Sequence, residues 1–167
     1  MAGRSAVVSL RMMNEDRFWS LVDELQGDVT DVGCRRLVLA LRRLDADEIL
    51  AFQDRLAEVL FRLDLRSIAK QRWRDVEQPR WVPRLPFISA DGFLYARCAA
   101  VAAGRSTVEA VLRDHREFRR SWDLGAERLL YVGEQAYVAA AHQPWPMERT
   151  SMFDYETGSN PAGGWAR

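Results

Sequence analysis

The stretch LDADEILAFQDRLAEVLFRL at residues 44–63 decides the fold, because it combines a helix start with a buried helical face. Asp45 and Glu48 have the spacing of a capping box, in which each side chain accepts a hydrogen bond from the other residue's backbone N–H. Apolar residues then recur at the period of an α-helix: Ile49, Phe52, Leu56, Val59, Leu60 and Leu63. Because no glycine or proline interrupts residues 46–78, the pattern predicts a helix that runs to about Trp73, with a bend near Asp64.

Two shorter helices precede this stretch. Asn14 supplies an N-cap, and the acidic residues after it suit the positive end of a helix dipole. This first helix ends at Gly27, and its buried face consists of Phe18, Leu21, Val22 and Leu25. Thr30 and Asp31 open a second helix, whose buried stripe consists of Cys34, Leu37, Val38, Leu41 and Leu44.

Proline interrupts the chain after the central helix. Residues 79–88 contain three prolines with Trp81, Leu85 and Phe87 among them, which predicts an ordered loop held by its aromatic side chains. Ser89 or Asp91 then caps a helix that Gly104 closes. Ser106 and Glu109 form a second capping box ahead of a short helix. Residues 125–141 carry small and apolar side chains on one face, which predicts a closely packed last helix.

The rest of the chain lacks a helical period. Residues 144–167 mix proline, glycine and serine with scattered aromatics, which is typical of an irregular tail, and SAVVSL at residues 5–10 is a weak strand candidate. We predict an all-α fold with a single compact domain of about six helices. Its parts are an N-terminal extension (1–12), a helical domain (13–143) and an irregular tail (144–167). The tail's aromatic residues predict that part of it lies against the domain or a neighbouring chain.

Charge and cysteine content favour a cytoplasmic protein. The 24 basic and 24 acidic residues cancel, so the whole chain has no net charge that would attract nucleic acid. Cys34 and Cys98 lie far apart in apolar helical stretches, where reduced and buried thiols are common. The apolar run near the start is too short for a secretory signal, and no stretch reaches the roughly 20 apolar residues that span a bilayer. We therefore expect a cytoplasmic location, no membrane contact and no cofactor.

Four segments resemble a single family when they are taken in order: EDRFWSLVDEL (15–25), LDADEILAF (44–52), SADGFLYAR (89–97) and ERLLYVGEQAY (127–137). They resemble the bacterial domain-of-unknown-function 4240 family over roughly residues 13–141. The residues that match its motifs are Phe18, Trp19, Asp91, Gly92, Phe93, Arg97, Glu127, Glu134 and Tyr137. The resemblance implies a small helical bacterial protein, and it implies no activity because the family has none assigned.

The chain also departs from this family pattern. Pro86, Phe87 and Ile88 stand where the family has paired glycines, and Ala99 stands where it has tryptophan, which argues against a shared ligand site. Family members begin close to the acidic and aromatic motif, so we expect Met12 or Met13 to be the true start. Residues 1–11 would then be a wrongly assigned extension, and an intact mass from the native cell that includes Met1 or Ala2 would contradict this.

The segment KQRWRDVEQPRWVPRL at residues 70–85 is the most suggestive cluster. It interleaves aromatic rings with guanidinium groups, the combination that stacks on bases and binds phosphates: Arg72, Trp73, Arg74, Arg80, Trp81 and Arg84. Residues 62–84 carry seven positive and three negative charges. The same residues would also have a purely structural role if the tryptophans hold the proline-rich loop in place while the arginines face water. Both interpretations therefore stay open.

Other candidate chemistry is sparse. A second basic run, Arg113, His115, Arg116, Arg119 and Arg120, suits either a helix C-terminus or an anionic partner. His115 and His142 have no metal-ligand spacing, and the fingerprints of hydrolases, thiol redox enzymes and nucleotide-binding loops are missing. Glu127 and Glu134 lie seven residues apart, as on one solvated helix face. Asp91 is either a cap or a functional carboxylate directed at Arg97.

These patterns leave three hypotheses. The first is a non-catalytic interaction or regulatory protein that binds a protein partner, with a homo-oligomer left open. The second is a binder of nucleic acid or a phosphorylated small molecule through residues 72–84. The third is an enzyme, which would gather Asp91, Arg97 and a tryptophan in one pocket. The sequence favours the first, because it shows no catalytic or metal motif.

Overall fold

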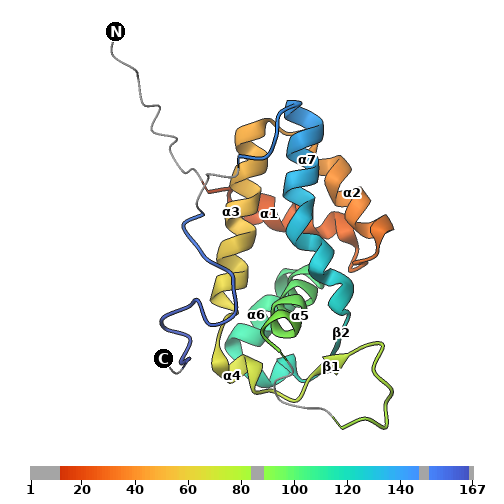
Figure 1. Cartoon of the computed structure of the whole chain (residues 1–167), viewed down its shortest axis with the longest axis vertical. Helices are drawn as coiled ribbons and strands as arrows, with labels where there is room; N and C mark the ends of the chain where they lie inside the picture. Colours follow the sequence, from red (N-terminus) through yellow and green to blue (C-terminus); the bar gives the residue numbers. More distant parts are fainter. Residues whose placement is uncertain (1–11, 84–88, 147–150, 166–167) are drawn as a thin grey trace.

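The computed structural model describes residues 12–83, 89–146 and 151–165. These residues form seven α-helices: α1 (Glu15–Val22), α2 (Asp31–Leu41), α3 (Ala46–Arg62), α4 (Arg66–Ala69), α5 (Ala90–Ala102), α6 (Arg105–Arg113) and α7 (Val132–Ala141). They also form three 3-10 helices: η1 (Asp23–Leu25), η2 (His115–Phe118) and η3 (Leu124–Tyr131). The predicted all-α class and single compact domain are confirmed (Figure 1). The strand candidate at residues 5–10 and the segment 1–11 lie outside the described residues.

Helix α3 forms the predicted capping box. The Asp45 carboxylate accepts a hydrogen bond from the Glu48 backbone N–H at 2.8 Å, and the Glu48 carboxylate accepts one from the Asp45 N–H at 3.2 Å. The prediction that this helix continues to Trp73 is wrong, since α3 ends at Arg62 and Leu65 adopts an extended backbone. The C-terminal tail contacts the chain at this point, where the Arg66 N–H donates to the Gly163 carbonyl at 2.8 Å.

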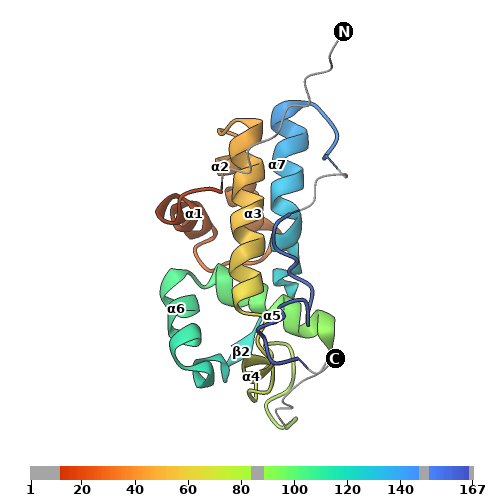
Figure 2. The same ribbon diagram turned by 90° about the vertical axis from the view of Figure 1, so that its left-hand side faces the viewer.

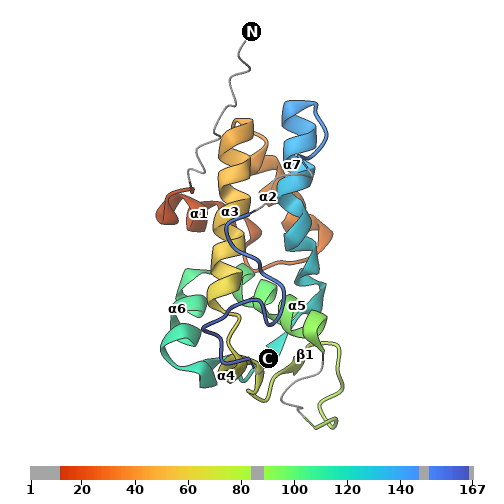
Figure 3. The same cartoon turned by 60° about the vertical axis from the view of Figure 1, so that its left-hand side comes forward.

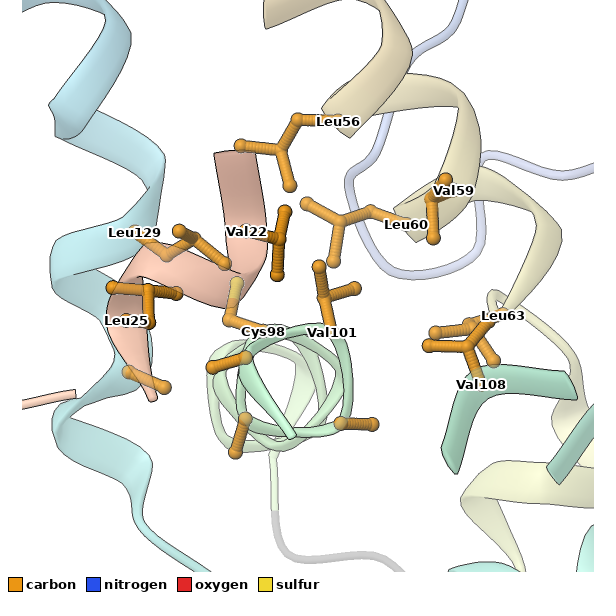
Figure 4. Packing of buried hydrophobic residues seen from close by; sticks show 14 of the residues in the cluster. Val22, Leu25, Leu56, Val59, Leu60, Leu63, Cys98, Val101, Val108 and Leu129 are labelled. Carbon is orange, nitrogen blue, oxygen red and sulfur yellow. The ribbon is translucent and has the colours of Figure 1, made fainter. Parts of the chain in front are cut away.

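Helix α5 lies at the centre of the core. Phe93, Cys98 and Val101 on this helix are fully buried, and nearly every other residue of α5 is buried too, because other elements surround it on most sides. Figure 4 shows Cys98 and Val101 directed toward Val22, Leu60 and their neighbours. Side chains from α1, η1, α3, α5, α6 and η3 therefore share one core.

One predicted helix boundary is confirmed and two differ in the structure. Ser89, and not Asp91, caps α5, because its hydroxyl accepts a hydrogen bond from the Gly92 N–H at 2.9 Å. Helix α6 begins at Arg105 after Gly104, whose φ of +99° suits glycine, so Ser106 lies inside the helix and does not cap it. The predicted helix over residues 125–141 is divided into the 3-10 helix η3 and the α-helix α7.

A small parallel sheet was not predicted. Strands β1 (Arg74–Asp75) and β2 (Ser121–Trp122) pair two residues each, with Arg74 opposite Ser121 and Asp75 opposite Trp122. Figure 1 shows this pair at the end of the molecule away from the top of α7. The pairing brings the two basic runs of the sequence side by side.

The tail lies against the domain, as its aromatic residues predicted. Residues 151–165 contain no helix or strand, and they run across the C-terminal part of α3 and along α5 (Figures 2 and 3). Phe153 packs on Phe61 with a centroid distance of 5.4 Å, and Trp165 packs on Phe93 at 6.0 Å. Trp145 contacts Tyr137 of α7 edge to face at 5.4 Å. Most of the tail's aromatic rings therefore face inward.

Candidate functional site

Two basic segments that are far apart in the sequence meet at one end of the fold. The Arg74 N–H donates to the Arg120 carbonyl at 3.3 Å, and the Val76 N–H donates to the Trp122 carbonyl at 2.9 Å. Residues 66–83 and 113–122, here called the basic end, carry nine basic and four acidic side chains. Because the net charge of the whole chain is zero, the basic end is a local excess of positive charge.

The two tryptophans of the basic end have opposite environments. Trp73 is fully buried, where its ring packs edge to face on Phe118 at 6.1 Å and its indole N–H donates to the Ala69 carbonyl at 3.4 Å. Trp81 is 84% exposed on the loop that follows β1. Core residues enclose the Trp73 ring, so it cannot stack on a ligand. The Trp81 ring is accessible to one.

The arginines of the basic end also differ in their contacts. Arg74 is held inside the loop, since its Nε donates to the Ser121 hydroxyl at 3.2 Å and its guanidinium donates to the Arg80 carbonyl at 3.2 Å. Arg72 and Arg80 are exposed, and no ion pair joins either of them to another described residue. Arg84, the sixth residue of the predicted cluster, lies outside the described ranges. Arg72 and Arg80 therefore remain available to an anion.

The second basic run is partly neutralised by its own acids. Arg116 makes paired hydrogen bonds to the Asp114 carboxylate at 3.0 and 2.8 Å, and these bonds lower the pKa of Asp114 to about 2. Arg120 pairs with Glu117 at 3.4 Å and lies over the Trp122 ring at 5.2 Å. This run contributes less free positive charge than its composition indicates.

Most residues of the family motifs are structural. Phe18 packs against Trp19 at 5.0 Å and against Phe52 at 5.2 Å, and all three rings are buried. Tyr137 is buried beneath Trp145. A Cβ at Gly92 would lie 2.9 Å from the Ser89 hydroxyl, so a larger residue there would displace this hydroxyl. The positions that match the family thus account for much of the core.

Glu127 and Glu134 lie on the surface of η3 and α7. The Tyr131 hydroxyl donates to the Glu127 carboxylate at 3.0 Å, and this hydrogen bond raises the pKa of Tyr131. Glu134 borders a shallow hollow of about 520 Å³ that Tyr131, Gln135, Val138 and Ala139 also line. The two glutamates do not share one regular α-helix, because η3 changes to α7 between them.

Asp91 and Arg97 do not form a joint site. Asp91 is exposed in the first turn of α5, whereas the Arg97 side chain is fully buried. The Arg97 guanidinium donates to the Leu60 carbonyl at 2.8 Å, to the Tyr155 carbonyl at 3.0 Å and to the Thr157 hydroxyl at 3.0 Å. Burial lowers the pKa of Arg97, and nearby Asp64 opposes that shift. The pocket expected by the enzyme hypothesis is therefore not assembled from these groups.

The contact between Asp64 and the tail is the feature that the sequence did not reveal. Both Asp64 carboxylate oxygens accept from the Gly158 N–H, at 3.1 and 3.0 Å, and one also accepts from the Asn160 N–H at 3.0 Å. Asp64 is fully buried, and the only hint in the sequence is its place at the predicted bend of the long helix. Backbone donors leave no residue pattern that could have identified this contact.

The described residues form neither a membrane-spanning helix nor a metal-binding cluster. None of the described helices is both long and apolar enough to cross a membrane. Within the same residues, no group of three or more His, Cys, Asp or Glu side chains lies close enough to hold a metal ion.

Fold and surface together define a small helical domain with an irregular tail packed on it and a tryptophan exposed at its basic end. The chain belongs to the family described as protein of unknown function (DUF4240), whose model matches residues 13–139. This match confirms the resemblance seen in the sequence, and it ends before the tail. Comparisons with curated proteins and with solved structures gave no match.

Proposed function

We propose that this chain is a non-catalytic binding protein that engages an acidic surface of a partner protein through its basic end. The observation that carries the proposal is the 84% exposure of Trp81, which directly follows the exposed Arg80 on the loop after β1. Tryptophan and arginine are enriched among the residues that dominate the binding energy of protein interfaces, and an indole left in water contributes no hydrophobic stabilisation to the fold.

The composition of the loop supports a protein partner. Val76 on the same loop is 51% exposed, so two apolar side chains stand among exposed polar ones. Arg72 and Arg80 are exposed nearby in the sequence. An apolar centre with a charged rim is the usual anatomy of a protein interface, and the positive rim favours an acidic partner.

The loop is also held in place, which lowers the entropy lost on binding. The Arg74 side chain bonds to the Arg80 carbonyl, and β1 bonds to β2 at the base of the loop. The Val82 N–H donates to the Pro79 carbonyl at 3.0 Å in a turn beside Trp81. Trp81 is thus presented by an ordered segment.

A second candidate function is the binding of nucleic acid or a phosphorylated small molecule by the same residues. It is favoured by the exposed Trp81 ring, which follows Arg80 in the sequence, and by the exposed Arg72 that precedes β1, because an aromatic ring suits a base and an arginine suits a phosphate. The burial of Trp73 leaves one stacking ring where the sequence offered two. The protein partner is therefore our first proposal.

Cellular location forms part of the same proposal. We infer a bacterial cytoplasmic protein, as the family resemblance implies. Support comes from Cys34 and Cys98, which are both free thiols in the buried core. Such thiols suit a reducing compartment.

Site-directed crosslinking in the native cell tests the proposal. A photo-crosslinking amino acid replaces Trp81 in one variant and Leu39, which is 49% exposed on α2, in a control. We expect an acidic protein crosslinked from position 81 only, and lost when Arg72→Glu and Arg80→Glu are added. Crosslinking to nucleic acid from position 81 would support the second candidate. Equal crosslinking from both positions, or none from position 81, would overturn both.

A further inference from the structure

The tail covers a defined surface of the helical domain. Here the tail-binding surface means the residues of α3, of the turn after it and of α5 that residues 153–165 contact: Phe61, Asp64, Ala90, Phe93 and Arg97. Figure 3 shows the tail crossing these elements. Each of these surface residues lies within residues 13–139, the part that matches the family model, whereas the tail lies beyond it.

Two buried charges of this surface bind the tail through its main chain. The Asp64 carboxylate accepts from two backbone N–H groups, those of Gly158 and Asn160, and Gly158 has a φ of +89°. Successive backbone N–H groups in such a turn form a concave site for an anion. Arg97 binds a backbone acceptor of the tail, because its guanidinium donates to the Tyr155 carbonyl at 3.0 Å.

The domain itself holds these charges in position. Arg97 donates to the Leu60 carbonyl of α3 at 2.8 Å, and its guanidinium carbon lies 4.9 Å from the centre of the Phe93 ring. Asp64 follows directly after the C-cap of α3. Both groups are therefore prearranged by helices that do not belong to the tail.

A few tail side chains add sequence preference. Thr157 accepts from Arg97 and donates its hydroxyl to the Ala90 carbonyl at 2.7 Å, and the Asn160 amide donates to the Phe61 carbonyl at 3.0 Å. Trp165 donates its indole N–H to the Asp64 carbonyl at 3.0 Å and packs on Phe93. Main-chain hydrogen bonds combined with a few side-chain anchors are the usual features of peptide recognition.

We propose that the tail-binding surface is a peptide-binding site, which this chain fills with its own tail and which an extended segment of a partner protein fills when the tail leaves. The partner segment carries a threonine, a glycine turn and an asparagine between two aromatic residues, as residues 153–165 do. The tail thus acts as a competing ligand within the same chain. Its covalent attachment gives it a high effective concentration, which keeps the affinity for free peptides low until the tail is released.

A labelled synthetic peptide of residues 151–165 is the probe, and fluorescence anisotropy is the measurement. The full-length chain is compared with full-length Gly163→Ala, because a Cβ at position 163 would lie 2.4 Å from the Asp64 backbone carbonyl and would loosen the tail. We expect Gly163→Ala to bind the peptide about tenfold or more tightly than the unchanged chain. Peptides carrying Asn160→Ala or Trp165→Ala should bind more weakly to the same protein, and a scrambled peptide should not bind.

Trp165→Ala in the full-length chain is a second variant with a loosened tail. It replaces Gly163→Ala in the binding measurement if Gly163→Ala does not fold. Circular dichroism and thermal melting establish whether each variant is folded. A folded loosened variant that shows no binding at about 1 mM peptide would overturn the proposal. Binding that is indifferent to the peptide substitutions would overturn it as well. If both variants unfold the whole domain, the tail is an integral part of the fold and the proposal is wrong.

Discussion

Asp64 and Arg97 are both fully buried, yet their nearest charged atoms lie 4.0 Å apart, too far for a hydrogen bond between them. Backbone N–H groups of the tail donate to Asp64, while Arg97 donates to carbonyls of α3 and the tail, and the Arg97 Nε has no hydrogen-bond partner among the described residues. The two charges therefore compensate each other through space; Asp64 accepts its hydrogen bonds from the tail, and Arg97 makes two of its three hydrogen bonds to the tail. Removing either one would leave the other buried and uncompensated.

Arg97→Met should lower the free energy of unfolding by about 3–5 kcal/mol, because it leaves the Asp64 carboxylate buried without a countercharge. Arg97→Lys keeps the charge but loses the planar fork that reaches three acceptors, so we expect a smaller loss of about 1.5–3 kcal/mol. Urea unfolding monitored by circular dichroism measures both losses. Arg35→Met removes an exposed arginine of α2 and should change stability by less than about 0.5 kcal/mol. Equal effects at positions 35 and 97 would contradict this account of Arg97.

Trp73→Ala and Trp81→Ala form a matched pair with opposite expectations. Trp73→Ala empties a site in the core beside Phe118 and should cost about 3–5 kcal/mol of stability. Trp81→Ala removes an exposed ring and should change stability by less than about 0.5 kcal/mol. If binding of a partner is lost on Trp81→Ala while the melting temperature is unchanged, the loss comes from the surface and not from unfolding. A large destabilisation by Trp81→Ala would show that its ring packs on the domain.

These two tryptophans show where reasoning from sequence stops. Helix α3 and the Asp45 capping box follow from local spacing, since every residue they require lies within a few turns. Trp73 and Trp81 have the same kind of neighbours in the sequence, but Trp73 packs on distant Phe118 and is buried, whereas Trp81 is exposed. The contact of Asp64 with Gly158 joins backbone and side chain across 94 positions, and a two-residue strand has no period to detect. Long-range main-chain contacts are therefore the part that no local pattern encodes.

The cap of α5 gives a smaller and sharper prediction. Ser89→Ala should cost about 1 kcal/mol, because the Gly92 N–H loses the hydroxyl that satisfies it. Ser106→Ala is the control, since Ser106 lies within the first turn of α6 and no side chain caps that helix. Its expected effect is within about 0.5 kcal/mol. Thermal melting of both variants measures the difference in stability. A larger loss of stability for Ser106→Ala than for Ser89→Ala would support the capping box that the sequence predicted at Ser106.

The Cys98 thiol should be inert in the folded protein. Burial raises the pKa of Cys98 to about 12, so very little thiolate forms at pH 8, and the side chain is fully enclosed. Burial also raises the pKa of Cys34, which is 6% exposed and should react first. We expect slow labelling of both thiols by a disulfide reagent at pH 8 and fast labelling in denaturant. Fast labelling of Cys98 in the folded state would contradict its burial.

The same raised pKa predicts how stability depends on pH. The folded state favours the protonated Cys98 thiol, while the unfolded chain releases that proton near pH 9. The stability that this thiol contributes is therefore fully present below pH 9 and is lost as the pH rises toward 12. Cys98→Ala should reduce that alkaline slope, which urea unfolding at several pH values can measure. If stability falls with pH as steeply in Cys98→Ala as in the unchanged chain, other titrating groups cause the loss of stability at alkaline pH.

Gly163→Ala tests whether the tail opens separately from the domain. The new Cβ would lie 2.4 Å from the Asp64 backbone carbonyl, so the tail must shift, and we expect the hydrogen bond from the Arg66 N–H to the Gly163 carbonyl to weaken. The described tail has no helix or strand, and segments of that kind open at lower free energy than core helices. We expect faster hydrogen exchange at the amides of Arg66, Gly158 and Asn160, with little change in α3.

Met152→Ala is the matched control, because Met152 is 65% exposed and its truncation should leave exchange in the tail unchanged. If Gly163→Ala instead raises exchange equally in α3 and α5, the tail and the helices unfold as one cooperative unit. That result would mean that Asp64 and Arg97 are never exposed without global unfolding, and a peptide could not replace the tail. Selective exchange in the tail would establish the free surface that such a peptide requires.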